Sequence, residues 1–288
     1  MKASSEPFRR PLGIFLQGGG ALGAGQAGAR GVLDAAGVRY DAIMGYSVGV
    51  VNGAALAFGR LEEAMEHWRR LDGGALKLSP RFKPFSLCSP DLPRSFFAAE
   101  SNDTVARATL KIDLTVVTSC FAEGASLNAR FSPGTRSGWD APFVEHAAAS
   151  CAIPAVFPPV DLVYRGRRVR LRDGGVPMRS PLDFTPLSKC SDLLVLEMVR
   201  ADELGRHALA PWRALDQAAR EKGRRLVDEG LNELILRAER PPRVFRLAPS
   251  RRLEPSMLDF RAAGLQKMLA LGAADAEALL AEPSRFTA

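Results

Sequence analysis

The sequence Ala42-Ile43-Met44-Gly45-Tyr46-Ser47-Val48-Gly49-Val50 decides the fold expected of this chain. Residues 42–44 have the apolar composition of the end of a buried strand, and residues 50–58 are mostly small and apolar, which suits a helix. Between them, Gly45-x-Ser47-x-Gly49 matches the strand–turn–helix motif called a nucleophile elbow. The pattern predicts a serine on a sharp turn, at the N-terminus of a helix whose dipole favours developing negative charge.

Glycine on either side of Ser47 gives neighbouring chain room for a close approach, and the sharp turn strains the backbone of the serine. A five-residue pattern also occurs often by chance. A glycine-rich turn without any chemistry is therefore the competing interpretation of this stretch, and the rest of the chain has to decide between the two.

The chain has 288 residues, 47% of them hydrophobic, which is ample for one large α/β domain or two small ones. No apolar run reaches the ~18–20 residues that a membrane-spanning helix needs, and the polar N-terminus has no signal-peptide pattern. Four cysteines are widely spaced and have no histidine cluster beside them, which predicts reduced, buried thiols and no metal site. They are Cys88, Cys120, Cys151 and Cys190. We therefore expect a cytoplasmic protein.

The net charge of +7 comes mainly from arginine. Such a balance suits anionic membrane surfaces, nucleic acid or acidic substrates. The basic residues are dispersed, and no aromatic-interleaved basic motif or nucleic-acid-binding signature is present. A solvated, arginine-rich surface is the first interpretation and peripheral contact with an anionic membrane is the second, while no nucleic-acid partner is expected.

Residues 12–16 predict a first strand, which runs into Gly18-Gly19-Gly20-Ala21-Leu22-Gly23 and then into a small-residue helix from about residue 24 to 36. Successive glycines after a strand let backbone N–H groups converge on one point, which suits an oxyanion or a phosphate. Two kinds of ligand therefore compete for this loop.

The phosphate alternative rests on Gly23-x-Gly25-x-x-Gly28, which matches a dinucleotide-binding fingerprint, with Asp41 near the distance of a ribose-binding acid. This motif falls partly inside the predicted helix, however, and Asp41 precedes its strand instead of ending it. A nucleotide-dependent oxidoreductase is therefore a minor alternative, and no cofactor is expected.

Strands and helices alternate along much of the remaining chain without an internal repeat or a low-complexity linker, which predicts a single α/β sandwich. The expected strands are residues 112–120, 127–131, 161–164, 168–171, 193–198 and 244–247. The expected helices are residues 61–71, 145–151, 211–237 and 257–280. Residues 78–97 carry four prolines among four phenylalanines, which argues against a regular helix or a central strand and predicts either a lid loop or a packed connector.

Three separated motifs occur in the order found in patatin-like phospholipases: Gly18-Gly19-Gly20-x-x-Gly23, Gly45-x-Ser47-x-Gly49 and Asp173-Gly174-Gly175. The segment Ala148-Ala149-Ser150-Cys151-Ala152-Ile153-Pro154-Ala155-Val156-Phe157-Pro158-Pro159 also resembles the stretch before the aspartate in that family. The resemblance covers about residues 12–182. It implies a three-layer α/β/α sandwich and a single patatin-like domain, which we expect at residues 10–285.

The resemblance implies a lipid acyl hydrolase of the phospholipase A, lysophospholipase or esterase type that uses a Ser-Asp dyad. Ser47 would be the nucleophile and Asp173 the base, while the N–H groups of Gly18, Gly19 and Gly20 would form the oxyanion hole. Gly45 and Gly49 would shape the nucleophile elbow. The substrate would be a lipid or a simpler ester. Taken alone, Asp173-Gly174-Gly175 is also a common tight turn.

The chain departs from the family pattern at two positions. Leu22 stands in the glycine loop where Arg or Lys is frequent, and Arg179 follows the aspartate motif where asparagine is common. Arg172 would lower the basicity of Asp173 unless its side chain points to the opposite face of the strand. These departures leave a catalytically silent lipid- or membrane-binding module with the same fold as the alternative function.

A Ser-His-Asp triad is the alternative mechanism. Ser47, Asp173 and His207 occur in the order of an α/β-hydrolase triad. His207 lies in a polar connector without a motif of its own, so a surface loop is its simpler interpretation. His67 and His146 lie in predicted helices, where packing or solvent exposure is expected.

Overall fold

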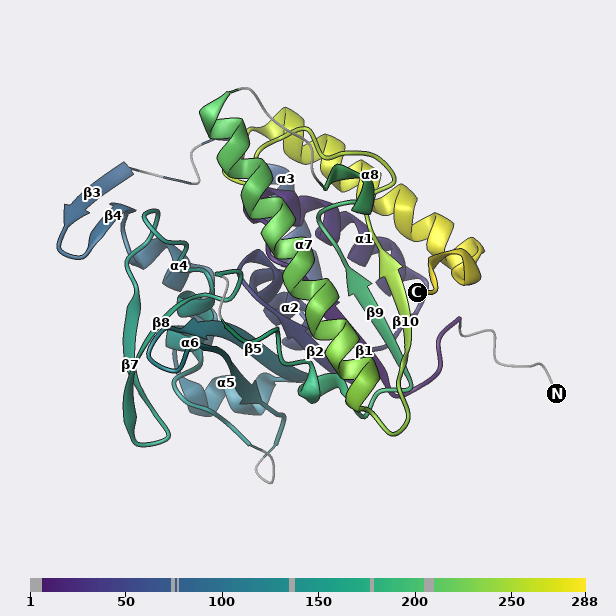
Figure 1. The fold of residues 1–288 in the computed structure, drawn as a ribbon, viewed down its shortest axis with the longest axis horizontal. Coiled ribbons are helices and arrows are strands. Elements are labelled where there is room, and N and C mark those ends of the chain that lie inside the picture. Colours follow the sequence, from purple (N-terminus) through teal and green to yellow (C-terminus); the bar gives the residue numbers. More distant parts are fainter. Residues whose placement is uncertain (1–6, 74–75, 77, 135–137, 177–178, 205–209) are drawn as a thin grey trace.

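The computed structural model describes residues 7–73, 76, 78–134, 138–176, 179–204 and 210–288. A large sheet with the strand order β10-β9-β1-β2-β5-β8-β7 crosses the molecule, and β6 pairs with β5 as a branch (Figure 1). A separate two-stranded sheet consists of β3 and β4. The strands are β1 Leu12–Leu16, β2 Ala42–Gly45, β3 Leu78–Phe82, β4 Phe85–Cys88, β5 Asp113–Cys120, β6 Ala125–Phe131, β7 Val160–Tyr164, β8 Arg167–Asp173, β9 Asp192–Leu196 and β10 Arg243–Leu247.

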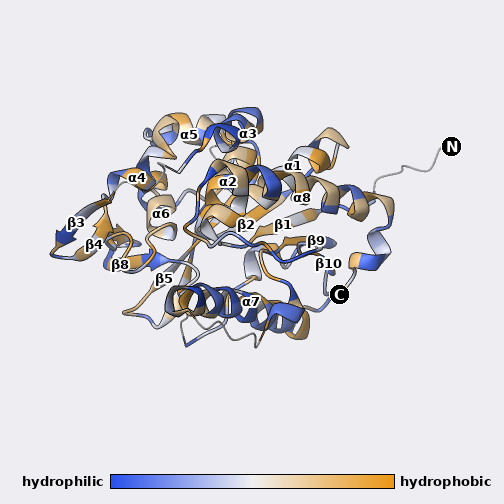
Figure 2. Ribbon diagram, turned by 90° about the horizontal axis from the view of Figure 1, so that it is seen from above, coloured by the Kyte–Doolittle hydropathy of each residue, from blue (hydrophilic) through white to orange (hydrophobic). Residues whose placement is uncertain are grey.

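Helices cover both faces of this sheet (Figure 2). They are α1 Gly23–Ala35, α2 Val48–Ala57, α3 Leu61–Arg70, α4 Asp91–Ser95, α5 Asp103–Thr109, α6 Phe143–Ser150, α7 Pro211–Arg237 and α8 Ala262–Ala281. Ile14 and Leu16 of β1 face the core beneath α1, α2 and α8, whereas Phe15 faces the core beneath α7. The predicted three-layer α/β/α sandwich is confirmed, and alternate side chains of β1 pack against both helical layers.

One edge of β5 pairs with two strands from different parts of the chain, β2 and β8. Gly45, at the end of β2, pairs with Val116 in parallel, and Asp173, at the end of β8, pairs with Thr118 in antiparallel. Because β6 occupies the other edge of β5 along this stretch, β2 and β8 must meet end to end on one edge. The two strand ends that carry the predicted dyad are thereby brought together.

Two glycines of the dinucleotide-like motif, Gly25 and Gly28, lie inside α1 and contact α8. A Cβ at Gly28 would stand 2.0 Å from the carbonyl oxygen of Leu269, and one at Gly272 of α8 would stand 1.9 Å from that of Gly25. Asp41 accepts the N–H of Leu12 at 2.7 Å and pairs with Arg10. These glycines let two helix backbones pack closely, so the fingerprint lacks the strand-to-helix loop that a dinucleotide site needs.

The proline-rich stretch differs in part from the expectation. Residues 78–88 form the β3–β4 hairpin outside the central sheet, and α4 follows it. Proline is tolerated there because both hairpin strands are edge strands. Helix α8 also begins later than expected, at Ala262, because Met257 and Leu258 belong to a non-helical segment that lines a groove.

Candidate active site

Ser47 stands between the end of β2 and the start of α2, with φ 55° and ψ −132°. Residues other than glycine rarely adopt positive φ, and such strain costs about 1–3 kcal/mol. The N–H of Ser47 donates to Oγ of Ser150 at 3.0 Å, and the Ser150 hydroxyl donates to the Val117 carbonyl at 2.6 Å. The last residue of α6 therefore ties the strained serine turn to β5.

The glycines on both sides of Ser47 face the end of β1. A Cβ at Gly49 would lie 2.0 Å from the carbonyl oxygen of Leu16, and one at Gly45 would lie 3.0 Å from the same oxygen. A side chain at Gly49 would push α2 away from β1, since the atom it meets belongs to the backbone. The absence of side chains at these positions keeps the turn close against the central strand.

Asp173 is the last residue of β8 and is buried beside Ser47. Both residues line one groove, which is described below. Its Oδ1 accepts the N–H of Gly175 at 2.8 Å, while Oδ2 has no regular hydrogen bond to any residue that the structure describes. Burial raises the pKa of Asp173 to about 6, and the nearby Ser47 hydroxyl and Gly175 N–H partly oppose this rise. The carboxylate thus keeps one oxygen free and a pKa suited to a general base near neutral pH.

The glycine loop runs along the other side of Ser47. A Cβ at Gly18 would lie 2.4 Å from the Tyr46 ring and 2.9 Å from Cβ of Ser47, so only glycine fits there. The Gly18 N–H is near the Tyr46 hydroxyl and acts on its pKa, which burial raises strongly. Among the described residues, the N–H groups of Gly19 and Gly20 have no hydrogen-bond acceptor. Within the described part of the chain, two backbone donors therefore remain without an acceptor in the loop that lines the groove together with Ser47.

A groove of about 2130 Å³ runs from these residues between α7 and the segment that leads into α8. Leu215 and Leu258 offer exposed apolar side chains to it. Cationic side chains without an acidic partner among the described residues also border it; these are Arg213, Lys222, Arg251 and Lys267. The groove therefore suits a molecule with an apolar part and an anionic part.

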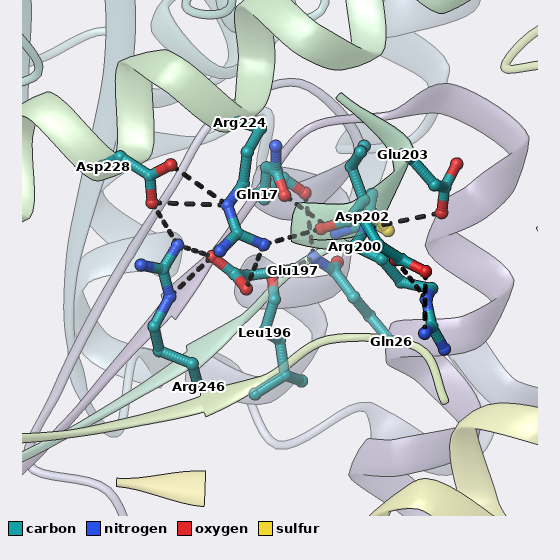
Figure 3. Close-up of polar contacts among 12 residues, drawn as sticks. Gln17, Gln26, Leu196, Glu197, Arg200, Asp202, Glu203, Arg224, Asp228 and Arg246 are labelled. Carbon is teal, nitrogen blue, oxygen red and sulfur yellow. Dashed lines mark hydrogen bonds and ion pairs between the residues drawn. The ribbon is translucent and has the colours of Figure 1, made fainter. Parts of the chain in front are cut away.

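Helix α7 closes one side of the groove and is fastened by buried ion pairs (Figure 3). Arg224 of α7 donates to Glu197 at 2.9 Å and to the Val199 carbonyl at 2.8 Å. Arg246 of β10 pairs with both Glu197 and Asp228. Burial raises the pKa of Glu197, and the two arginines oppose this rise. The cluster holds α7 against the ends of β9 and β10.

Gly223, one residue before Arg224 on α7, packs against residues next to the site. A Cβ at Gly223 would lie 3.1 Å from Nε2 of Gln17 and 3.4 Å from the Tyr46 hydroxyl. Gln17 in turn accepts the N–H of Met198 at 2.8 Å through Oε1. Gln17 and Tyr46, which flank the glycine loop and the serine, are thus packed under α7.

Two of these residues, Ser150 and Glu197, are not recognisable as site residues from the local sequence. Ser150 lay within the segment that resembles the patatin-like family, but its bond to Ser47 joins residues 103 positions apart. Glu197 follows a buried strand, where a charged residue is rare. That placement was the available sign that Glu197 would need a buried partner.

The described histidines lie away from the groove lining. His67 is exposed on α3. His146 is fully buried, packs edge-on against Phe131 and Tyr164, and has its pKa lowered to about 4 by burial. The packing and exposure expected of these two histidines are confirmed. His207 lies outside the described residues.

The residues that depart from the family pattern also lie away from the Asp173 carboxylate. Leu22 is fully buried at the edge of the groove. Arg179 is exposed, and its side chain lies against the Gly124 turn. Arg172 lies over the Phe121 ring, on the opposite face of β8 from Asp173. It is not among the groups that shift the pKa of Asp173.

A family model described as Patatin-like phospholipase matches residues 14–185, which is more than half of the chain. The protein therefore belongs to the patatin-like phospholipase family, whose members are in general lipid acyl hydrolases. Among solved structures, the fold is similar to that of VipD from Legionella pneumophila, with a TM-score of 0.50 and 14% sequence identity. That match covers 95% of this chain and 67% of VipD.

A search of the curated proteins gives no match to this chain. Within the described ranges, no helix has the length and apolar content to cross a membrane. The same ranges contain no group of three or more His, Cys, Asp and Glu side chains arranged to hold a metal ion. The four cysteines are free and buried, as expected.

Proposed function

We propose that this protein is a serine acyl hydrolase that cleaves lipid acyl esters with Ser47 as nucleophile and Asp173 as base. One observation carries the proposal: the strained Ser47 turn, the half-free Asp173 carboxylate and the glycine loop border one groove. Family membership supports the same reaction class. In this proposal Gly45 and Gly49 shape the elbow.

The reaction follows from these roles. Oγ of Ser47 attacks the ester carbonyl carbon while Oδ2 of Asp173 accepts the hydroxyl proton. The carbonyl oxygen becomes an oxyanion and accepts hydrogen bonds from the loop Gly18–Gly20, chiefly from the free N–H groups of Gly19 and Gly20. Collapse of the intermediate expels the alcohol, which takes the proton from Asp173. Water then attacks the acyl-enzyme and gives a proton to Asp173. Collapse of this second intermediate breaks the bond between Oγ of Ser47 and the acyl carbon, Oγ takes the proton back from Asp173, and the acid is released.

The groove supports a lipid as the substrate class. Exposed Leu215 and Leu258 can contact an acyl chain, and the cations Arg213 and Lys222 on α7 can contact an anionic headgroup. A short neutral ester would use the serine but little of the groove. We therefore expect phospholipid or lysophospholipid to be cleaved with a lower KM than a short ester.

The test is hydrolysis of short- and medium-chain chromogenic esters, followed by fatty-acid release from phospholipid. Ser47→Ala and Asp173→Asn should each lose about 10³-fold or more in kcat/KM, with unchanged circular dichroism. His207→Ala should keep wild-type activity. Loss of activity in His207→Ala would instead support the triad, and full activity in Asp173→Asn would refute the dyad.

The silent lipid-binding module is the second candidate. Leu22, an apolar residue in the glycine loop, favours it because no loop cation is present there to assist an oxyanion. The same assays decide between the two candidates. A folded wild-type protein that binds lipid but cleaves no ester or phospholipid would favour the module.

A further inference from the structure

The β3–β4 hairpin stands apart from the rest of the fold. Both views show it projecting beyond α4, at the end of the molecule opposite the C-terminus (Figures 1 and 2). Its two strands form a sheet of their own, separate from the sheet that crosses the molecule. An isolated hairpin of this kind is marginally stable in water, so its sequence needs a reason beyond its own pairing.

One face of the hairpin is apolar and exposed. Phe82 pairs directly with Phe85, so their side chains share a face, and Leu87 follows two positions later on that face. Phe82 is 85% exposed, Phe85 55% and Leu87 39%. Scattered exposed apolar residues are ordinary, but a cluster of aromatic side chains at the tip of a projecting element indicates a binding surface.

The charged side chains of the hairpin are all basic. Arg81 and Lys83 flank Phe82, and residues 78–88 contain no Asp or Glu. Neither cation has an acidic partner among the residues that the structure describes. Aromatic rings between basic side chains suit the headgroup region of an anionic bilayer, where the rings insert and the cations meet lipid phosphates.

The edge of β4 and the buried face of the hairpin contact a segment that leads to the groove. Leu87 and Cys88 donate their N–H groups to the carbonyls of Ala155 and Val156, each at 2.9 Å. Buried Cys88 packs with Ala152, whose carbonyl accepts the N–H of Asp173 at 3.1 Å. Residues 153–154 of the same segment border the groove. The hairpin is therefore linked to the base of the candidate dyad through residues 152–156, by hydrogen bonds and by the packing of Cys88 on Ala152.

We propose that the β3–β4 hairpin is a membrane-docking element that inserts Phe82 and Phe85 into the surface of an anionic bilayer and brings the groove to its lipid. The inference of membrane contact rests on the hairpin alone. The inference that this contact aids catalysis also rests on the proposed function. Insertion of two rings at the bilayer surface is a sizeable part of the binding free energy of a peripheral protein.

The test of docking uses Ser47→Ala protein, which should leave the lipid intact, and vesicles of phosphatidylcholine with or without phosphatidylglycerol. Replacing both rings, Phe82→Ser with Phe85→Ser, gives the ring variant, which should sediment with the anionic vesicles about tenfold or more weakly. The matched control is Leu236→Ser with Val105→Ser, since these side chains are 85% and 51% exposed on other elements. Equal binding to the anionic vesicles by the ring variant and the control would overturn the proposal.

The charge contribution is tested separately. Arg81→Gln with Lys83→Gln should weaken binding to phosphatidylglycerol vesicles and flatten its dependence on salt, because two contacts with anionic lipid are lost. Unchanged binding and salt dependence would contradict the role of these cations. Concentration-dependent dimerisation without lipid, abolished by the ring variant, would assign the hairpin to a second copy of the chain and overturn membrane docking.

Activity distinguishes failure of this inference from failure of the proposed function. With Ser47 present, the ring variant should hydrolyse a soluble short-chain ester at the wild-type rate but release fatty acid from anionic vesicles about tenfold more slowly. If no form cleaves any ester while the ring variant still loses vesicle binding, docking holds and the reaction fails. If esters are cleaved and vesicle binding is unaffected, the reaction holds and docking fails.

Discussion

The backbone N–H of Ser47 is bonded to the side chain of Ser150, 3.0 Å away across 103 residues of sequence. Ser150 passes the connection on to the carbonyl of Val117 on β5. A buried polar bridge therefore adds to the backbone bonds that hold the serine turn at positive φ, through a hydroxyl that takes no part in the proposed reaction.

Removing this bridge should lower both stability and activity. In Ser150→Ala, two buried backbone groups lose their partner, which should cost about 1–3 kcal/mol in the free energy of unfolding. The freed turn should also reduce kcat more than it raises KM, because the nucleophile is misplaced. Urea unfolding and ester kinetics measure the two effects.

The control for this prediction is Ser119→Ala, which loses a serine hydroxyl that donates to the Val176 carbonyl at 2.8 Å but does not contact Ser47. It should lose stability and keep kcat. An equal loss of kcat in both variants would argue that Ser150 has only a structural effect.

Activity should rise with pH through about 6, the pKa to which burial raises Asp173. The base must be ionised to accept the proton of Ser47, so kcat/KM for a neutral ester should fall about tenfold per pH unit well below that pKa. It should be level above pH 7. Circular dichroism across the same range checks that the protein stays folded, and a flat profile from pH 5 to 8 would contradict Asp173 as the base.

The same carboxyl should make the protein less stable as pH rises. Its pKa in the folded state lies above the ordinary aspartate value of 3.8, so the folded state binds the proton more tightly, and that stabilisation is lost as pH rises from about 4 through 6. Asp173→Asn removes the buried charge and should gain roughly 3 kcal/mol over wild type at pH 8 relative to pH 3. Thermal unfolding at both pH values measures this, and an equal difference at the two would refute it.

Two glycines of α1 should respond in opposite directions to alanine. Gly28→Ala would place Cβ 2.0 Å from the Leu269 carbonyl and should force α1 and α8 apart, at a cost of several kcal/mol. Gly31→Ala meets only the end of the Met65 side chain at 3.6 Å and should stabilise α1 by about 0.5–1 kcal/mol. Equal effects in urea unfolding would show that helix propensity, and not close packing, controls these positions.

The buried cluster beneath α7 should be far more sensitive than surface ion pairs. Glu197→Ala leaves Arg224 and Arg246 without their shared buried partner and should cost about 3–5 kcal/mol. Asp161→Ala breaks a pair with Arg170 in which both side chains are more than 60% exposed, and should cost about 0–1 kcal/mol. Comparable losses in the two variants would mean that burial of the cluster adds nothing.

Local patterns predicted the elements that place Ser47. Strand β1 begins and ends where its apolar run does, and α7 spans the whole expected range, because side-chain periodicity and flanking prolines act within a few residues. The hairpin 161–171 was also visible, since Arg165-Gly166 is a turn pair between two β-rich runs. Both glycines and the serine of the elbow are local features of one turn.

What the sequence could not supply is pairing over long distances. Nothing near Asp173 indicates that β8 meets β2 end to end on β5, because that arrangement depends on which edge β6 takes. Helix α5 was missed although Asn102 caps it with bonds to the N–H groups of Thr104 and Val105. The β3–β4 hairpin was missed because Pro80 and Pro84 weaken every strand pattern, and only an isolated edge pair tolerates them.

The order of strands has a consequence for synthesis on the ribosome. β1 emerges first, but its neighbour on one side is β9, and Leu12 pairs with Asp192 about 180 residues later. At about 5–20 residues per second, the ribosome takes roughly 10–40 s to supply that neighbour. Until then the chain carries the apolar run 12–16 without the pairing that β9 supplies. We expect the nascent chain to need shielding in this interval, and catalytic competence to arise only after β9 and β10 have been made.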